Sequence, residues 1–561
     1  MNSLLEHISS ESMFISEREG CECTGNSVSD INLSLWKAIV GDDFFTTRLT
    51  IEGISEHRAR NLSGVSHRQD TPKWLEWLSE FMNVPIENEM KIDFEKIGGP
   101  VFLINSFIPI LVFCKRKLMD KTNLEIIPEG LVDGAIIYLA RDFMSISHRC
   151  IFPEIFGEAG ERFFQDGKVL NMQWFEYLFC QYPVLARLFF EKSTIWAFNS
   201  VTLFNRLKKD MAVIEKTFGV KGLPTQMDTG FSDSHNKGQS VVLLKWNDGT
   251  KIVYKPHSSL LAKEWTDFLK VYNVSTFDIK ILNRQNYSYT EFVHYDPNGN
   301  PLTFYYHAGM LLAACMISGA TDIHYENLIA KGDIPVIIDT ETIACPLLGK
   351  LVISPDQSGL LSVKKYVNGF CIGDWGGLVA NENGENVPTV PFRKEYMVML
   401  MDGFKSVMHH EKYSFHYSNP VRCVLRNTML YSTIQTQCLN RKRMRNGFLY
   451  SLPIEQLSSV LKYGQDKLGI YKSEQKSMER LDIPYFYCFP DGKDLFSEGC
   501  MLAKDFFDKS VNEHIDMRVN LLKDDQEIER CIKLVLESLR RPTPSVTPLD
   551  KILFAQIMNK C

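Results

Sequence analysis

One stretch, residues 319–342, constrains the fold of this chain more than any other. It reads GATDIHYENLIAKGDIPVIIDTET. Its first half places Asp322, His324 and Asn327 in a short loop after an apolar segment, and a Gly-Asp turn follows. The apolar run after that turn is typical of a strand, and it ends at Asp339. The pattern therefore predicts a polar loop, a turn and a strand that delivers one further carboxylate.

These residue types suit a site that binds a metal ion and a polyphosphate. An Asp such as Asp322 can accept a hydroxyl proton, and Asn327, five residues on, can offer an amide oxygen to a divalent ion. Asp339 can then bridge that ion to the phosphates. A helix-capping Asp and a surface Asn would give the same letters, so this stretch alone leaves both interpretations open.

Composition narrows the class of protein. The chain has 561 residues, of which 45% are hydrophobic and 23% charged, as in ordinary globular proteins. Its length suits about three or four domains, or one large two-lobed unit with an extension. The net charge is −6, so there is no basic excess to attract nucleic acid or an anionic membrane.

The sequence carries no signal for export or membrane insertion. Its N-terminus lacks a basic segment followed by an apolar core, and the most apolar run, residues 101–114, is too short and too polar to span a bilayer. The fourteen cysteines include no Cys-x-x-Cys and no adjacent Cys-His pair, which argues against a zinc ribbon. We expect a cytoplasmic protein with reduced thiols and no zinc.

The hydrophobic periodicity changes near residue 230. Before it, the pattern is mainly helical, with one start signal at Thr71 (N-cap) and Pro72 (first turn) and one break at Pro183. After it, strands alternate with turns, and an Asp-Gly turn predicts a hairpin. The expected elements are strands at 240–246, 251–256, 276–282 and 287–294, a buried helix at 305–318, a loop-rich segment at 343–391 and helices from 393 onward, including 524–539.

Lys255 is the first partner to consider for the opening stretch. It lies in a hydrophobic run on the second strand of the predicted hairpin, where two-lobed phosphotransferases hold a Lys that grips phosphate oxygens. A lone strand Lys can also be a solvated charge. The glycine-rich fingerprint of protein kinases is missing, so any phosphate cover must use the polar backbone of FSDSHNKGQS.

The order Lys255, Asp322-x-His324-x-x-Asn327, strand, Asp339 resembles lipid kinases more than protein kinases. Asp339 is followed by Thr-Glu where protein kinases carry Phe-Gly. Glu341 is thus a second carboxylate within reach of a metal, and it could share the ligation with Asn327 and Asp339.

Two further motifs do not belong to a plain kinase. Asp233 and His235 flank a Ser just before the hairpin; a carboxylate beside a His can fix its tautomer and raise its basicity. In RCVLRNT, Arg422 and Arg426 would share a helical face and could clamp a phosphate, with Thr428 nearby. A turn Asp with a surface His, and a helix with solvated arginines, are the alternatives.

Together these segments are similar to the dehydratase domain of class II lanthipeptide (lantibiotic) synthetases of the LanM type. They occur in family order from about residue 100 to 540. YSYTEF differs slightly, since the family usually has Gly and Trp where Ser288 and Tyr289 stand. The matching segments are YPVLARL, GFSDSHNKGQSV, YKPHS, YSYTEF, TDIHYENLIAKGDIPVIIDTET, RCVLRNTMLY and DIPYF.

The resemblance implies an α+β fold with a two-lobed, lipid-kinase-like catalytic core, a large mainly helical N-terminal region and helical C-terminal additions. The implied domains are a helical region at 1–220, an N-lobe with β-hairpins at 221–304 and a C-lobe at 305–561. It also implies one site for two reactions. ATP and magnesium serve to phosphorylate Ser and Thr of a ribosomal precursor peptide, and phosphate elimination then leaves dehydroalanine or dehydrobutyrine.

The family's residue roles carry over position by position. Lys255 would grip the ATP phosphates, Asp322 and His324 would serve phosphoryl transfer, and Asn327, Asp339 and Glu341 would hold magnesium. Asp233, His235, Arg422 and Thr428 match positions linked to phosphate elimination. The sequence does not decide which of these takes the α-proton.

One departure concerns the end of the sequence. Class II synthetases continue into a zinc-dependent cyclase domain with Cys and Cys-His ligands, and this sequence ends at Cys561 without them. We therefore expect a dehydratase half standing alone, or a split or truncated gene product. Its expected partners are the precursor peptide, a separate cyclase and an export transporter, which could bring it to the inner face of the bacterial membrane.

Two other functions remain open. One is a plain kinase with the same fold that phosphorylates a hydroxyl and stops, against which Asp233, His235, Arg422 and Thr428 argue. The other is a catalytically silent scaffold that binds the precursor or a cyclase, against which the intact Lys255 and the residues of the opening stretch argue.

Overall fold

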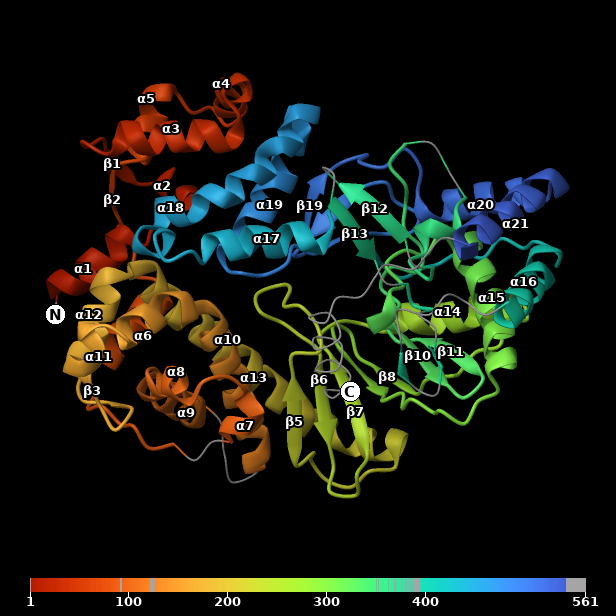
Figure 1. Ribbon diagram of the computed structural model, residues 1–561, viewed down its shortest axis with the longest axis horizontal. Coiled ribbons are helices and arrows are strands. Elements are labelled where there is room, and N and C mark those ends of the chain that lie inside the picture. The colour runs from red at the N-terminus through yellow and green to blue at the C-terminus, as the bar shows by residue number, and fades with distance from the viewer. Residues whose placement is uncertain are drawn as a thin grey trace. The chain divides into compact units, whose positions relative to one another are not determined.

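The chain folds into two compact units, each built from two separate segments (Figure 1). The computed structural model describes residues 2–540 apart from 91–92, 122–126, 350, 352, 362, 368–369, 375, 379–380, 383–384 and 387–393. The first unit comprises Met1–Pro256 and Arg426–Tyr485, and the second His257–Leu425 and Phe486–Cys561. Parts of the expected loop-rich segment at 343–391, and the end of the expected C-lobe, lie outside the described residues.

Helices and strands are both present, in agreement with the α+β class, and helices predominate. The chain passes from one compact unit to the other after Pro256, Leu425 and Tyr485, whereas the sequence suggested domain boundaries near residues 220 and 304. Those boundaries, and the likeness of the core to lipid kinases, stay predictions.

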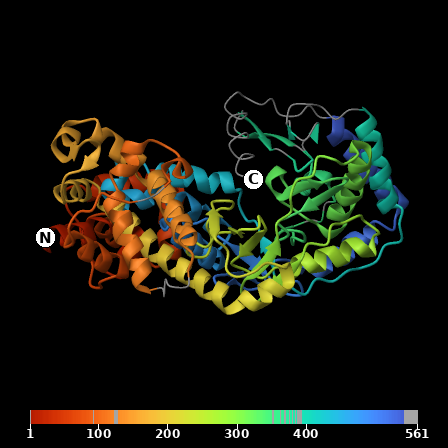
Figure 2. The same ribbon diagram turned by 90° about the horizontal axis from the view of Figure 1, so that it is seen from below.

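The N-terminal part of the first unit is helical, as expected, and its later helices are the orange to yellow coils of Figure 2. Its helices are α1 (Asn2–Glu11), α2 (Ile15–Arg18), α3 (Ser29–Val40), α4 (Asp42–Ile51), α5 (Glu56–Leu62), α6 (Lys73–Met82), α7 (Phe94–Ile97), α8 (Val101–Asn105), α9 (Ile108–Lys121), α10 (Glu129–Ile155), α11 (Glu158–Phe163), α12 (Gln173–Gln181) and α13 (Pro183–Phe218). Four short strands lie among them as two antiparallel pairs, β1 (Glu22–Thr24) with β2 (Val65–His67), and β3 (Phe164–Gln165) with β4 (Lys168–Val169).

One helix signal acts differently from the expectation: Pro72, not Thr71, is the N-cap of α6. The expected break at Pro183 is confirmed, because α12 ends at Gln181 and a separate helix, α13, begins at Pro183. A proline in the first turn loses no hydrogen bond that the helix would make. The apolar run at 101–114 is helical and largely buried, divided between α8 and α9.

The strands of the first unit follow α13. They are β5 (Gln226–Thr229), β6 (Val242–Lys245) and β7 (Lys251–Lys255), antiparallel neighbours in that order. The register pairs Lys245 with Lys251, which confirms the hairpin that the Asp-Gly turn predicted.

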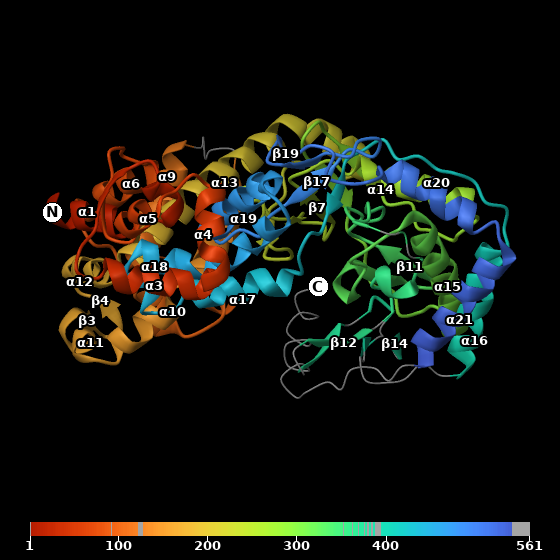
Figure 3. The same cartoon turned by 90° about the horizontal axis from the view of Figure 1, so that it is seen from above.

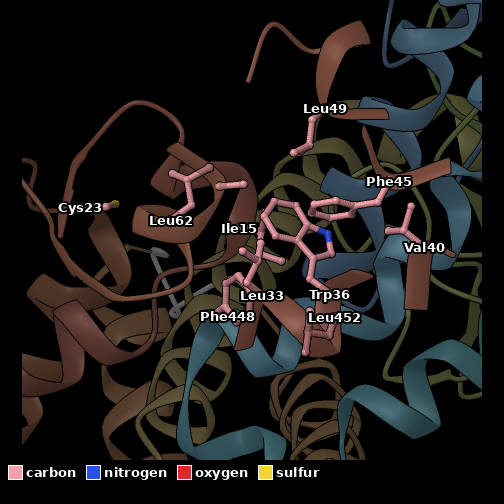
Figure 4. Packing of buried hydrophobic residues seen from close by; sticks show 11 residues of the cluster. Ile15, Cys23, Leu33, Trp36, Val40, Phe45, Leu49, Leu62, Phe448 and Leu452 are labelled. Atoms are coloured by element: carbon pink, nitrogen blue, oxygen red, sulfur yellow. The ribbon is translucent and has the colours of Figure 1, made fainter. Parts of the chain in front are cut away.

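The second segment of the first unit completes its core. It contributes α17 (Thr428–Cys438), α18 (Gly447–Ser451), the 3-10 helix η4 (Leu452–Tyr463) and α19 (Leu468–Glu479). Trp36 of α3 is fully buried, with its ring edge-on to Phe45 at 5.4 Å and to Phe448 at 5.7 Å between centroids. Figure 4 shows Phe448 and Leu452 packed into the same cluster as Trp36 and Phe45. Residues far apart in the sequence therefore form one core.

The second unit combines short strands with helices. Its strands are β8 (Ile281–Asn283), β9 (Ser288–Glu291), β10 (Leu328–Lys331), β11 (Ile334–Ile337), β12 (Val363–Val367), β13 (Phe370–Asp374), β14 (Asn381–Glu382), β15 (Glu385–Asn386), β16 (Val421–Cys423), β17 (Phe486–Cys488), β18 (Leu495–Ser497) and β19 (Cys500–Ala503). Its helices are α14 (Leu260–Val271), α15 (Pro301–Ser318), α16 (Lys394–Met408), α20 (Val511–Leu521) and α21 (Asp525–Arg540).

Three helices of the second unit pack against one another in sequence. α15, the buried helix predicted at 305–318, packs along α16, and α16 packs against α21, as Figure 3 shows. α15 ends at Gly319, and the chain then enters the loop that carries Asp322. A rigid, buried helix therefore leads directly into the opening stretch.

Candidate functional site

The strand that was predicted to end at Asp339 is the second arm of a hairpin. β10 and β11 are antiparallel, with Leu328 opposite Ile337, and the Ile338 amide donates to the Asn327 carbonyl at 3.0 Å. Asn327 and Asp339, which are twelve positions apart in the sequence, are thus brought beside each other at one end of the hairpin. The prediction of a polar loop followed by a strand is confirmed.

The loop before this hairpin is held in a fixed conformation by its own polar groups. Asp322 has a left-handed backbone, with φ of 61°, which an L-residue adopts only when its surroundings enforce it. The Asn327 side-chain amide donates to the Asp322 carbonyl at 2.9 Å and lies 3.2 Å from Nε2 of His324. His324 caps a short 3-10 helix, Tyr325–Asn327, by accepting from the Glu326 amide.

Neighbouring segments of the second unit fix the base of the same loop. The Thr321 amide donates to the Thr342 carbonyl, and the Ile323 amide donates to the Ser358 carbonyl, both at 2.9 Å. Gly359 has φ of +78°, and a Cβ atom there would lie 3.0 Å from the Ile323 nitrogen. This close approach requires glycine and locks the backbone next to Asp322.

Glu341 connects the hairpin to the side chains of His257 and Arg422. Its Oε1 lies 3.0 Å from Nε2 of His257, and its Oε2 lies 3.3 Å from Nη1 of Arg422. The Arg422 amide also donates to the Glu341 carbonyl at 2.9 Å, and the Glu341 amide donates to Oδ1 of Asp339 at 3.2 Å. Asp339, Glu341 and Arg422 therefore form one connected cluster.

His257 is a member of this cluster that the sequence analysis did not single out. Its Nδ1 faces the Ser258 carbonyl at 3.2 Å and its Nε2 faces the Glu341 carboxylate. The available signal was its place in YKPHS, directly after the strand that carries Lys255.

The predicted magnesium ligands form a set of hard oxygen donors. Within the described part of the chain, no group of three or more His, Cys, Asp and Glu side chains is arranged to hold a metal ion. Asn327, Asp339 and Glu341 instead offer one amide oxygen and two carboxylates. Magnesium is commonly held by one or two carboxylates together with substrate phosphates, so the donor set fits that ion.

His235, in the first unit, lies on a tight turn. Its amide donates to the Gln239 carbonyl at 2.9 Å, and the Gln239 amide donates back at 2.8 Å. The three residues between them, Asn236, Lys237 and Gly238, all have left-handed backbones. Asp233, at the start of this segment, is exposed.

The tautomer of His235 is set by the backbone. Its Nδ1 lies 2.8 Å from the Ile483 carbonyl, and a carbonyl can only accept, so Nδ1 carries the proton. In the neutral ring Nε2 then carries no proton and can accept one, as a general base does. A backbone carbonyl thus takes the tautomer-fixing role that the sequence pattern assigned to a carboxylate. The Tyr485 ring lies edge-on at 5.7 Å from the imidazole.

The helical interpretation of RCVLRNT is wrong. Arg422 lies on β16, opposite Tyr487 of β17, and α17 begins only at Thr428, capped by the Asn427 side chain. Arg426 falls in the link between them and donates to both oxygens of the buried Glu474, at 2.7 and 3.2 Å. The two arginines do not share a helix face, because Arg422 lies on a paired strand and Arg426 forms an ion pair with Glu474.

Lys255 is the last residue of β7, and its side chain is partly exposed. The preceding residue, Tyr254, is buried, accepts from Arg206 and lines a cavity of about 60 Å³. Side chains alternate between the two faces of a strand, so Lys255 points away from that cavity.

The predicted residues fall into two sets. Asp322, His324, Asn327, Asp339, Glu341 and Arg422 belong to the second unit, where the contacts above join them. Asp233, His235, Lys255 and Thr428 belong to the first.

Comparison with known proteins gives two matches. A family profile described as a domain of unknown function, DUF4135, matches residues 182–362 and 379–488. A protein of Lactococcus lactis subsp. lactis, named lacticin 481/lactococcin biosynthesis protein LcnDR2, is 26% identical in an alignment that covers 50% of this chain. The alignment spans 37% of the length of that curated relative. In the described residues, no helix is both long enough and apolar enough to cross a membrane.

Proposed function

Because the chain belongs to the DUF4135 family, a domain found in LanM-type lanthipeptide synthetases, we propose that it is a dehydratase of lanthipeptide biosynthesis. It uses ATP and magnesium to phosphorylate Ser and Thr of a ribosomal precursor peptide, and it then eliminates the phosphate. The products are dehydroalanine and dehydrobutyrine. The precursor is its main partner, and a cyclase and an export transporter are further proposed partners.

The observation that carries this proposal is the β10–β11 hairpin. It brings Asn327 beside Asp339, while the hydrogen bond from Asn327 holds the Asp322 backbone in place. An Asp with an Asn five positions on, next to a strand-end Asp, is the arrangement expected for phosphoryl transfer. Magnesium, when bound by Asn327, Asp339 and Glu341, would neutralise charge on the phosphates.

Each residue of the second unit has a role in the first half-reaction. Asp322 accepts the proton of the peptide hydroxyl as the hydroxyl oxygen attacks the terminal phosphorus of ATP; the bond from that phosphorus to the bridging oxygen breaks and ADP leaves. His324 and Asn327 hold the loop that orients Asp322. Lys255 binds phosphate oxygens, a role that its position on β7 and the family resemblance support.

The elimination half-reaction needs a base and a place for the departing phosphate. A base removes the α-proton, the Cα–Cβ double bond forms, and the Cβ–O bond breaks with its electrons leaving on phosphate. We assign the proton to Nε2 of His235, which the bond at Nδ1 leaves as acceptor. Arg422 and Thr428 stabilise the phosphate, and Asp233 supports the positive charge that His235 gains.

Two alternatives differ from this function in their product. A kinase without elimination would leave phosphorylated peptide, and a non-catalytic scaffold for the precursor or a cyclase would leave the peptide unchanged. The tautomer of His235 favours the dehydratase over the kinase. A surface His with no chemical role would not need a hydrogen bond that keeps the proton on Nδ1 and leaves Nε2 to accept one.

The test is to incubate the full chain with the precursor peptide of the neighbouring gene, ATP and magnesium, and to record the peptide mass. Loss of water at Ser and Thr is expected. A lasting gain of phosphate would identify the kinase, and an unchanged peptide would identify the scaffold. Omission of magnesium with added chelator should stop the reaction.

A further inference from the structure

The DIPYF motif, residues 482–486, has no role in the proposed reaction so far. Its first residue, Asp482, is buried, with 1% of its surface exposed. Both carboxylate oxygens are engaged by the turn that carries His235. Oδ1 accepts from the Ser234 hydroxyl at 2.8 Å, and Oδ2 accepts from the Gly238 amide at 3.0 Å. One side chain thus grips the turn on both sides of His235.

The backbone next to Asp482 adds two more bonds to the same turn. The Ile483 amide donates to the Ser234 carbonyl at 2.9 Å, and the Ile483 carbonyl accepts from Nδ1 of His235 at 2.8 Å. Asp482 and Ile483 therefore hold both the backbone of the turn and the ring of His235.

Two cations lie beside the buried carboxylate. Nζ of Lys192 is 3.9 Å from Oδ1 of Asp482, and Nε of Arg480 is 3.8 Å from Oδ2. The buried carboxylate thus has an amide donor, a hydroxyl donor and two cationic side chains around it. Burial raises the pKa of the neighbouring Asp142, and Asp482 raises it further, while Lys192 lowers it.

The turn needs such support because its conformation is strained. Asn236 and Lys237 have φ of 45° and 68°, in the left-handed region that residues with a side chain disfavour. At Gly238, a Cβ atom would approach Cγ2 of Ile195 to 2.8 Å, so this position is closed to a side chain. Left-handed residues in a row persist only where surrounding contacts enforce them.

We infer that Asp482 is a positioning residue for the elimination half-reaction. By binding Ser234 and Gly238 it holds the turn so that Nδ1 of His235 meets the Ile483 carbonyl and Nε2 remains the proton acceptor. This inference rests on the proposed function. Asp482 touches no reacting atom; it acts through His235.

The first measurement compares the two half-reactions in Asp482→Asn, with the precursor of the neighbouring gene, ATP and magnesium. An asparagine has one acceptor oxygen where the carboxylate has two. Its NH₂ group would therefore face either the Ser234 hydroxyl or the Gly238 amide, which now donate to Asp482, and one of these two hydrogen bonds would be lost. We expect elimination to fall at least about 10-fold and phosphorylation to stay within about twofold, so that phosphorylated peptide accumulates. The matched control is Glu455→Gln, which changes an equally buried carboxylate in the same unit.

The second measurement asks whether Asp482 acts through His235. In a His235→Ala background, Asp482→Asn should cause no further loss of elimination, because the group that it positions is gone. A residue that only stabilises the fold would add its effect to that of His235→Ala. Ser234→Ala removes one of the two hydrogen bonds to the Asp482 carboxylate and leaves the buried charge in place, and it should lower elimination by about threefold. This variant keeps the inference testable if Asp482→Asn does not fold.

The third measurement needs no reaction. Hydrogen exchange of the full chain, followed on peptides that contain residues 234–239, should speed up at least about 10-fold in Asp482→Asn and Ser234→Ala, with the rest of the first unit unchanged. Unchanged exchange in this segment overturns the inference. So does an equal fall in both half-reactions, or an additive loss with His235→Ala. If the wild-type chain fails to dehydrate the peptide, the proposed function falls, and the exchange result alone decides whether Asp482 positions the turn.

Discussion

Two loops carry the proposed chemistry of this chain, and they are held in different ways. The loop of Asp322 and Asn327, in the second unit, is fixed largely by nearby residues; its side-chain bond spans five positions. The turn of His235, in the first unit, is fixed by a segment 248 positions away. Both contain left-handed residues that need enforcement. The backbone of the Asp322 loop is thus held mainly by residues close to it in the sequence, and that of the His235 turn by residues far from it in the sequence.

This difference decides what each loop is sensitive to. The Asp322 loop depends on its own hairpin and on Ser358–Gly359. The His235 turn depends on the correct docking of α19 and the DIPYF segment, and therefore on the core of the whole first unit. Substitutions far from His235 in the sequence should change elimination, whereas phosphorylation should respond mainly to residues near Asp322.

The largest effect is expected from Asp322→Asn. An amide cannot accept the hydroxyl proton, so phosphorylation should fall by about 10³-fold or more and dehydration with it. The peptide should stay unmodified by mass, while thermal unfolding stays close to that of the wild type because Asp322 is exposed. If Asp322→Asn still gave dehydrated product at a tenth of the wild-type level, Asp322 would not be the residue that accepts the hydroxyl proton.

The next largest effect separates His235 from Arg422. His235→Ala should lower elimination by about 10²- to 10³-fold and leave phosphorylation nearly intact, so phosphorylated peptide accumulates. Arg422→Ala should also leave phosphorylated peptide, but with phosphorylation slowed by about 10-fold, because it removes the ion pair with Glu341. Time courses of both peptide masses give the two rates. Unmodified peptide from both variants would contradict the assigned division of labour.

A third prediction concerns the distant contacts of the first unit and pH. Burial raises the pKa of Glu479 to about 8, well above its ordinary value, and its carboxyl accepts from Ser16. The folded unit keeps a proton that the unfolded chain releases, so this stabilisation is full below about pH 4.5 and is lost as the pH rises to about 8.

Glu479→Gln should therefore unfold like the wild type near pH 4.5 and be more stable than the wild type above pH 8, by on the order of 5 kcal/mol. Urea unfolding of both proteins across this range measures the difference. Glu161→Gln, which changes an exposed carboxylate of α11, is the control and should show no such trend. A difference that is constant with pH would mean that Glu479 does not hold the proton.

The smallest effect is expected from Gly359→Ala. A methyl group 3.0 Å from the Ile323 nitrogen, on a backbone with φ of +78°, should displace the Asp322 loop and slow phosphorylation by about 10-fold. Gly249→Ala is the matched control, since it has φ of +85° but open space around its Cβ position. Equal effects of the two substitutions on phosphorylation would show that strain, not the contact with the loop, is responsible.

The sequence predicted what local patterns can encode. The β6–β7 hairpin, the buried helix before Gly319 and the strand that leads to Asp339 all follow from periodicity and turn residues, and all are present. The helical interpretation of RCVLRNT failed because Arg422 pairs with a strand that lies more than sixty residues further along the chain. The position of Arg426 is set by Glu474, a buried partner that no local pattern reveals.

The same limit explains the site residues that the sequence missed. His257 belongs to the Glu341 cluster through a contact that spans about half of the second unit's first segment. Asp482 and Ile483 reach His235 from the far end of the first unit's second segment. Their motifs were visible, but the role of each depends on tertiary contacts, and no spacing rule predicts those.

The two-segment composition of the first unit has a consequence for synthesis on the ribosome. His235 emerges 248 residues before its Ile483 partner, with the first segment of the second unit between them. At about 5 to 20 residues per second, that delay is roughly 10 to 50 seconds. During this interval the His235 turn lacks the contacts with Asp482 and Ile483, so it can reach its final conformation only after the second segment of the first unit has been made.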